Sequence, residues 1–514
     1  MHSPMPTTPL LRRTTLLALA ALAAAPLASS SGVSLGAQAV PAAPTRVSKV
    51  QPPAEAPNGA RTGARTGALD RSKAPTPGPT PALRVPAIEM RTLSNGISVA
   101  VLENHELPVV TVRAVLDLST LLDPAGKEGL TGLTLQMLGE GTRTRTADQL
   151  ADAYARLGST VSPTGFLTIT PNLDSALVLM REQLWEPAFP QASLDRIRAN
   201  QIAGLRRAKE QPAYLASRVL ANALYGQGHP YERTTTEPSL ASVTRGDLVA
   251  FHADYVRPQN VKLVVAGDIT PARTVAVLEK AFGAWPAGGK KASYQVATPP
   301  QVGRTTIYLY DRPGSAQSAI VAGAVGPRRD APEFYALDLA NTVLGGSFLS
   351  RLNMNLRERH GYAYGAGSAF SYRKRPELGQ FTASANVQTD KTDSALVELM
   401  NEVRGTAGER PITQEELRIA LSNAVKALPL RFETVGQIAG AAATVLADSL
   451  PLDYYRTLSG RYTALSLADV NAAASRYIDP RRLAIVIVGD RKQIEEKLRA
   501  TGIAPVVVVD EQAK

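Results

Sequence analysis

The chain has 514 residues, 44% hydrophobic and 20% charged, which predicts two to four domains of a soluble globular protein with a sizeable core. Cysteine is absent, and this excludes disulfides, thiolate catalysis and zinc or iron–sulfur sites built from cysteine. The net charge of +11 is spread thinly, with no Lys/Arg run interleaved with aromatic residues, so the sequence does not indicate a nucleic-acid partner.

The first 39 residues have the pattern of an export signal. Arg12 and Arg13 supply the positive end, residues 14–27 are apolar, and residues 37–39, Ala-Gln-Ala, form a small-residue cleavage site. The apolar stretch is too short and too rich in alanine for a membrane anchor, so no membrane span is expected. We therefore predict that the mature protein lies outside the cytoplasm, in a bacterial periplasm.

Composition then divides the rest of the chain. Residues 40–86 are rich in Pro, Ala, Gly and Thr without apolar periodicity, which predicts a disordered linker. An N-terminal domain is predicted over residues 87–287, a second linker over 288–303 and a C-terminal domain over 304–510. Helices and strands interleave without a regular βαβ alternation, so the predicted fold class is α+β.

Periodicity and turn signals predict the elements of the first domain. Asn95-Gly96 marks a hairpin within residues 91–103, a strand follows over 109–118, and Leu130, Leu133 and Met137 give a short helix face. Thr146 and Gln149 form a capping box that opens a helix, which Gly158 ends. Further helices are predicted over 173–184, 194–209, 214–224 and 272–282, with a buried strand over 260–266.

The pattern starts again after the second linker. Strands are predicted near 305–310 and 319–324 and over 362–372 and 378–386, and helices over 334–344, 349–358, 392–405 and from the capping box at Thr413 and Glu416. Six positions also repeat with a constant offset of 222 residues. They are Thr244, Asp247, Tyr255, Pro258, Gly267 and Asp268, which match Ser466, Asp469, Tyr477, Pro480, Gly489 and Asp490. The repeat is interpreted as a duplicated unit of about two hundred residues. The duplication is either only an internal pseudo-dyad or the source of a cleft between two similar halves that holds an extended substrate.

Residues 344–364 are the stretch with the clearest chemical potential. Gly345-Gly346 indicates a helix stop and a turn, and Leu349, Leu352 and Leu356 fall on one face of the next helix. Arg357 is then on the last turn of that helix, and Tyr364 opens the following strand. A guanidinium and a phenol brought together there can hold a peptide carbonyl or a developing oxyanion without a metal. The alternative is an arginine packed along its helix and a half-buried strand tyrosine.

Three motifs together resemble the M16 (insulinase/pitrilysin-like) metallopeptidases of the short, processing-peptidase type. They are GL-x-x-L-x-x-x-ML-x-x-GT-x-x-R from residue 129, His229-Pro230-Tyr231, and LGG-x-x-x-SRL-x-x-x-LRE-x-x-G-x-AY from residue 344. The resemblance covers residues 88–500. It implies an M16/LuxS-like metallohydrolase fold of two homologous halves, which together form one half of a clamshell.

The first half departs from that family where the family binds zinc. Its inverted motif, His-x-x-Glu-His, aligns so that Gly132 and Gln136 stand at the two His positions and Leu135 at the Glu position. The third ligand, a later Glu, aligns best with Gly204. Gly and Leu offer no donor atom and Gln is a poor zinc ligand, so we expect no zinc and no other cofactor in this chain. His105, His229, His252 and His360 have no ligand spacing and are interpreted as surface or polar-core residues.

The second half keeps the family's Arg and Tyr, seven residues apart, as Arg357 and Tyr364. The resemblance implies that they bind substrate, and Gly345 and Gly346 either admit a peptide backbone or only stop the helix. One hypothesis is a zinc-lacking subunit, inactive alone, that supplies Arg357 and Tyr364 to a zinc-bearing M16 partner in a heterodimeric metalloendopeptidase acting on peptides. The second is a non-catalytic scaffold or peptide-binding protein. A complete metallopeptidase with unrecognised ligands is a third.

Overall fold

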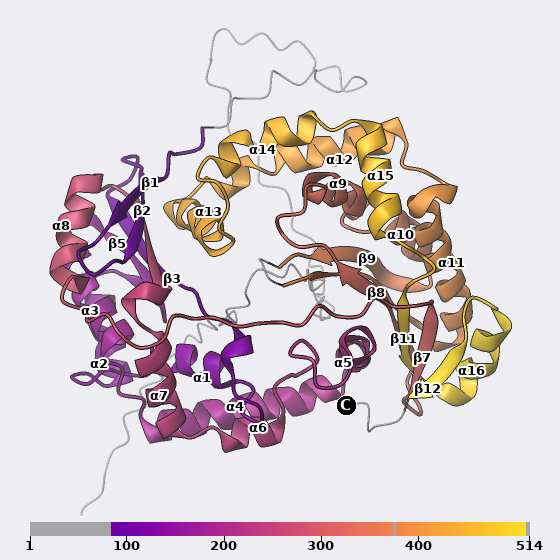
Figure 1. Cartoon of the computed structure of the whole chain (residues 1–514), viewed down its shortest axis with the longest axis horizontal. Coiled ribbons are helices and arrows are strands. Elements are labelled where there is room, and N and C mark those ends of the chain that lie inside the picture. Colours follow the sequence, from indigo (N-terminus) through magenta and orange to yellow (C-terminus); the bar gives the residue numbers. More distant parts are fainter. Residues whose placement is uncertain (1–83, 374–376, 510–514) are drawn as a thin grey trace, which may run out of the picture. The chain divides into compact units, whose positions relative to one another are not determined.

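The computed structural model describes residues 84–373 and 377–509. The predicted export signal and nearly all of the linker predicted over residues 40–86 lie outside the described residues. The fold is α+β, as the sequence predicts, with two six-stranded sheets and helices on their faces (Figure 1). None of the helices in the described ranges is long and apolar enough to cross a membrane.

The two sheets have the same strand arrangement except at one edge, where β1 is antiparallel to β2 whereas β12 is parallel to β7. The first runs in the order β1-β2-β6-β3-β5-β4 and the second in the order β12-β7-β11-β8-β10-β9. Their central strands, β6 and β11, each run parallel to one neighbour and antiparallel to the other. The strands are β1 Glu89–Thr92, β2 Ser98–Glu103, β3 Val109–Leu116, β4 Thr160–Ser162, β5 Gly165–Ile169, β6 Val261–Gly267, β7 Thr306–Asp311, β8 Gln317–Gly326, β9 Ala363–Ser371, β10 Gly379–Gln388, β11 Ala484–Gly489 and β12 Val506–Val509.

The helices follow the predicted pattern in most places, and the capping boxes at Thr146 and Thr413 are both formed. The first half contains α1 Leu130–Met137, α2 Ala147–Arg156, α3 Leu173–Trp185, α4 Gln191–Lys209, α5 Pro212–Tyr225, α6 Glu237–Ser242, α7 Arg245–Tyr255 and α8 Pro271–Phe282. The second contains α9 Phe334–Leu344, α10 Arg351–Asn353, α11 Thr392–Arg404, α12 Gln414–Lys426, α13 Val435–Ala447, α14 Tyr454–Thr463, α15 Leu467–Tyr477 and α16 Arg491–Ala500.

The 222-residue repeat corresponds to one structural unit in each half. Thr244 caps α7 and Ser466 caps α15, and each helix leads to the central strand of its sheet. Both central strands end in a glycine because a side chain has no room there. A Cβ on Gly267 would lie 2.1 Å from the carbonyl oxygen of Val109, and one on Gly489 would lie 2.4 Å from Ser318 Oγ. The two halves are therefore homologous in structure.

Each sheet is covered on one face by a helix from the other half. Successive residues of β6 alternate, so Val265 packs on the core of its own half while Val264 packs on α13. In the same way Ile485 of β11 packs on its own half and Val486 packs on α5. Figure 1 shows α5 beside β8 and β11. Burial on both faces explains why these strands are continuous apolar runs rather than alternating ones.

The helix predicted over residues 349–358 is wrong in its start and its type. It begins at Arg351, and after Asn353 it continues as a π-helix, Met354–Arg359. Leu352 and Leu356 are buried as predicted, but Leu349 is 66% exposed. The physical reason is that Leu349 lies in the turn before the helix, where helical periodicity does not apply.

A substitution at Leu220 tests whether α5 of the first half packs on the sheet of the second half. The Cδ2 atom of Leu220 lies 2.8 Å from the position that a Cβ on Gly323 of β8 would take, so the helix and the strand are in close contact. Leu220→Ala should lower the free energy of unfolding by about 2–5 kcal/mol, because a buried contact between the halves is replaced by a cavity. Urea unfolding followed by circular dichroism measures this. The exposed Leu107→Ala is the control and should change stability by less than about 0.5 kcal/mol; equal midpoints for both variants would contradict the packing described here.

Candidate functional site

Arg357 lies on the surface in the π-helix Met354–Arg359. Its side chain is 41% exposed, and its Nε atom is 3.3 Å from Glu358 Oε1. The guanidinium carbon lies 4.8 Å from the centre of the Phe348 ring, a cation–π distance. Most donors of this guanidinium are therefore available to a ligand that approaches the segment.

Tyr364 is near the start of β9, as predicted, and is 90% exposed. Within the described part of the chain, no hydrogen bond or ring contact joins its side chain to Arg357. The structure thus places both predicted residues on one short segment without bringing them into contact. A guanidinium and a phenol in this state can each donate to an acceptor supplied from outside.

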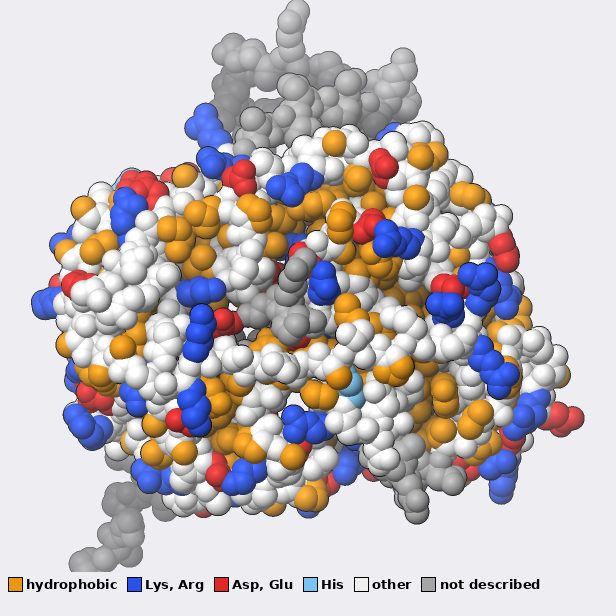
Figure 2. Space-filling model, in the orientation of Figure 1, with side chains coloured by type: hydrophobic (Ala, Val, Ile, Leu, Met, Phe, Trp, Pro, Cys, Tyr) orange, Lys and Arg blue, Asp and Glu red, His pale blue; other side chains and the backbone are white. Residues whose placement is uncertain are grey.

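The segment that carries Arg357 also exposes several apolar side chains. Phe348 is 59% exposed, Leu349 66% and Met354 39%, all in the same segment as Tyr364. We call these four residues, Phe348, Leu349, Met354 and Tyr364, the apolar surface. Exposed apolar side chains concentrated in one segment are typical of a binding surface. On the face drawn in Figure 2, by contrast, Lys and Arg side chains are scattered among acidic ones rather than gathered in one patch.

Gly345 and Gly346 join α9 to the turn before α10. A Cβ on Gly345 would lie 2.1 Å from the backbone nitrogen of Ser368 in β9, and one on Gly346 would lie 2.8 Å from Asn341 Nδ2. The close approach that these glycines permit is therefore to the chain's own strand and helix. Their binding of a peptide backbone stays a prediction.

Two polar residues hold the segment that carries Arg357. The guanidinium of Arg351 donates to both oxygens of Glu416, each at 2.7 Å, and to the carbonyl oxygens of Arg410 and Pro411 at 2.7 and 3.1 Å. Asn355 Nδ2 donates to two carboxylates of α11. Burial opposes ionisation of Glu416, but Arg351 and the cap of α12 outweigh it and lower its pKa to about 2. Because the pKa of Glu416 is lower in the folded state than in the unfolded chain, the ionised carboxylate stabilises the folded state at pH values above the unfolded pKa. This contribution is lost as the pH falls toward 2.

The positions aligned with the zinc ligands lie on two adjacent helices, α1 and α4. Gln136 Oε1 accepts a hydrogen bond from Gln201 Nε2 at 2.8 Å, so an amide pair joins the helices there. Gly132, Leu135 and Gly204 have no donor atoms, and nothing lies within 4 Å of a Cβ built on Gly132. These residues do not fit a zinc ion. Sequence reasoning missed Gln201, although it precedes Gly204 by about one helical turn.

The four histidines among the described residues have other partners. His252 is buried against the carbonyl oxygen of Leu184, and burial lowers its pKa. His229 lies 2.9 Å from the carbonyl oxygen of Ala297, His105 pairs with Asp268, and the ring of His360 stacks on Tyr362. In the described ranges, no three His, Asp or Glu side chains come close enough together to hold a metal ion.

Other motif residues stabilise the fold. Thr142 and Arg145 both bind the buried carboxylate of Glu182 in α3. Burial opposes ionisation of Glu182, but Arg145 and the neighbouring threonines outweigh it and lower its pKa. These contacts attach the loop that carries the Gly-Thr-x-x-Arg part of the motif to α3.

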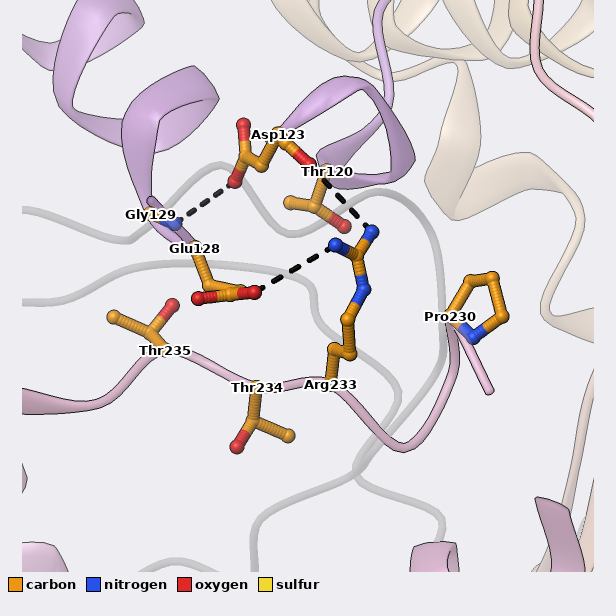
Figure 3. Close-up of a pocket in the computed structure, with 8 residues that line it drawn as sticks. All are labelled: Thr120, Asp123, Glu128, Gly129, Pro230, Arg233, Thr234 and Thr235. Atoms are coloured by element: carbon orange, nitrogen blue, oxygen red, sulfur yellow. Dashed lines mark hydrogen bonds and ion pairs between the residues drawn. The ribbon is translucent and has the colours of Figure 1, made fainter. Parts of the chain in front are cut away.

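A polar pocket of about 220 Å³ lies at the start of α1 (Figure 3). Asp123 accepts from the backbone N–H of Gly129 at 2.8 Å, and burial raises its pKa. Arg233 points between its two partners, with Nη1 3.6 Å from Glu128 Oε1 and Nη2 donating to the carbonyl oxygen of Asp123 at 3.5 Å. These pairings tie α1 to the loop after α5. The pocket is lined by Thr120, Asp123, Glu128, Gly129, Pro230, Arg233, Thr234 and Thr235.

Comparison with known proteins agrees with this geometry. A family model described as the peptidase M16 inactive domain matches residues 242–423. A Helicobacter pylori protein named "Non-peptidase homolog YmxG" is 26% identical over 76% of this chain and 91% of its own length. A Bacillus subtilis relative, 24% identical over 68% of this chain and 85% of its own, is named an uncharacterized zinc protease.

Solved structures show the same likeness. The crystal structure of a peptidase M16 inactive domain from Pseudomonas fluorescens has a TM-score of 0.70 and 25% identity, and the match covers 78% of this chain and 97% of that chain. The periplasmic protease PqqL from Escherichia coli has the same fold at 17% identity, with a TM-score of 0.64 over 82% of this chain and 49% of its own. Sequence motifs, sheet topology and relatives agree that the chain is similar to proteins of the M16 peptidase family.

Proposed function

We propose that this chain is the zinc-lacking subunit of a heterodimeric M16 metalloendopeptidase and supplies Arg357 and Tyr364 to a zinc-bearing partner. The observation that carries the proposal is a contrast between the halves. The zinc-ligand positions of the first half hold two glycines, a leucine and an amide pair. The second half keeps exposed donors among apolar side chains, on a segment that polar bonds hold in place.

The two donors suit the charge that develops when a peptide bond is attacked. A guanidinium and a phenol hydroxyl can both donate to a carbonyl oxygen as it becomes an oxyanion. The exposed Phe348 and Leu349 would pack against apolar groups of the peptide or of the partner. The partner would provide the metal-activated water, and this chain would orient the peptide and stabilise the oxyanion. By itself the chain would bind peptides without cleaving them.

The proposed setting is the periplasm. The leader pattern of residues 1–39 supports export, and one protein of the same fold is described as a periplasmic protease. The substrates we propose are small or unfolded polypeptides, and together with the partner this chain would close a clamshell around them.

A non-catalytic scaffold or peptide-binding protein is the second candidate. Two descriptions favour it, since the matching family model is called an inactive domain and one relative is named a non-peptidase homolog. The two candidates differ in what Arg357 and Tyr364 do, because a scaffold needs no oxyanion donors.

Peptidase activity of the reconstituted pair tests the catalytic role. The partner to test is an M16 protein with the motif His-x-x-Glu-His from the same organism, sought first among the neighbouring genes. The substrate is a mixture of internally quenched fluorogenic peptides. We expect activity for the pair and none for this chain alone. Arg357→Ala and Tyr364→Phe should each lower kcat by about 10²-fold or more, as loss of an oxyanion donor does. Arg359→Ala, an exposed arginine of the same π-helix, is the matched control and should stay close to wild type. Unchanged turnover in both variants would favour the scaffold.

The apolar surface generates a separate prediction about pairing. Leu349→Ser removes an exposed apolar side chain without opening a cavity, so the fold should be retained. The dissociation constant of the pair should rise about tenfold if Leu349 is buried against the partner. Biolayer interferometry measures this, and Leu107→Ser, an equally exposed leucine of the first half, is the control. If both variants bind the partner as tightly as wild type, Leu349 is not part of the contact.

A further inference from the structure

The helix that carries Arg357 has little intrinsic support. Its α-helical part is three residues long, Arg351–Asn353, and the rest is the π-helix Met354–Arg359. π-helices are rare, occur mostly as single turns within α-helices and are often found at functional sites. Contacts from neighbouring elements must therefore hold this segment in place.

The equivalent helix of the first half is supported differently. α2 precedes the outer strand β4 as the Arg357 helix precedes β9, and each helix ends at a glycine with positive φ, Gly158 at 62° and Gly361 at 64°. α2 is a regular α-helix that begins with a capping box at Thr146. Ser350 stands at the same place before α10, but among the described residues its hydroxyl has no hydrogen-bond partner. The second half lacks the cap that starts α2.

Arg351 stabilises the start of this helix, where a cap is lacking. Its side chain is 10% exposed, and its guanidinium makes a two-point contact with Glu416, the third residue of α12, which forms the capping box with Thr413. It also donates to the carbonyl oxygens of Arg410 and Pro411. A planar guanidinium fork fixes direction as well as distance, which an ammonium group does not. The start of the helix is thereby fixed to the segment that enters α12.

We propose that Arg351 is a positioning residue that holds the π-helix so that Arg357 and Tyr364 are presented in one fixed arrangement. It acts through the backbone, since its guanidinium is bound to Glu416, Arg410 and Pro411. The predicted effect of Arg351 on catalysis rests on the proposed function. The mechanical part, that Arg351 orders residues 354–364, stands without it.

Hydrogen–deuterium exchange of the isolated chain tests the mechanical part. The amides to follow are those of His360, Gly361 and Tyr362, which bond back into the helix. Arg351→Met keeps the length of the side chain and removes the fork, so exchange there should rise about tenfold or more, while exchange in α9 stays as in wild type. Arg351→Lys and Glu416→Gln should raise exchange at the same amides and are the variants to use if Arg351→Met does not fold.

Arg418→Met is the matched control. Arg418 makes the same two-point contact with Glu415 on α12, but both side chains are exposed. The Arg418→Met variant should leave hydrogen–deuterium exchange unchanged in every segment. Wild-type exchange at His360, Gly361 and Tyr362 in Arg351→Met would overturn the inference, and so would a uniform rise that includes α9, because that indicates a general loss of stability.

Peptidase assays of the pair test the catalytic consequence. Arg351→Met should lower kcat at least about tenfold with KM within about twofold, because the donors are present but misplaced. A loss confined to KM would overturn the positioning role. If the wild-type pair is inactive, the proposed function fails, whereas the exchange measurement still decides whether Arg351 orders the segment.

Discussion

Each β-sheet of this chain has one face that a single helix from the other half buries. α5 packs on the second sheet through Leu220 and its neighbours, and α13 packs on the first through Ile438 and its neighbours. The cluster between helix and sheet contains small residues, among them Ala439 of α13 and Ala266 of β6, which allow a close approach. Lys262 of β6 also donates to the carbonyl oxygen of Leu446 near the end of α13. Neither sheet is complete without the other half, so the surface that carries Arg357 is built on a frame to which both halves contribute.

The sequence predicts those elements of the fold that are determined by interactions between residues close in sequence. Capping boxes, the Asn95-Gly96 hairpin and the apolar run of β6 depend on neighbours in sequence, and all are confirmed. The short outer strands β4 and β12 were missed, because β4 is exposed and carries no apolar alternation. The reciprocal covering by α5 and α13 was also missed, since it depends on pairing between elements hundreds of residues apart.

The candidate site was only partly predictable. Chemistry that depends on residue type was visible in sequence, namely the lack of donor atoms at Gly132 and Leu135 and the presence of Arg357. Geometry that depends on packing was not visible. The π-helix, the amide pair of Gln136 with Gln201 and the exposure of Leu349 each result from contacts between separate elements. Helical periodicity failed in the stretch to which we assign the proposed function, and failures of this kind are common at functional sites.

The central claim is an asymmetry between the halves: the first half lacks the donor atoms of a zinc site, whereas the second half has Arg357 and Tyr364. Native mass spectrometry of the isolated mature chain, titrated with zinc, tests it most directly because the readout does not depend on a partner or a substrate. We expect the mass of the metal-free chain, with zinc adducts that scale with concentration and vanish on dilution. One tightly held zinc per chain would contradict the account, since it would require a ligand set that α1 and α4 do not provide.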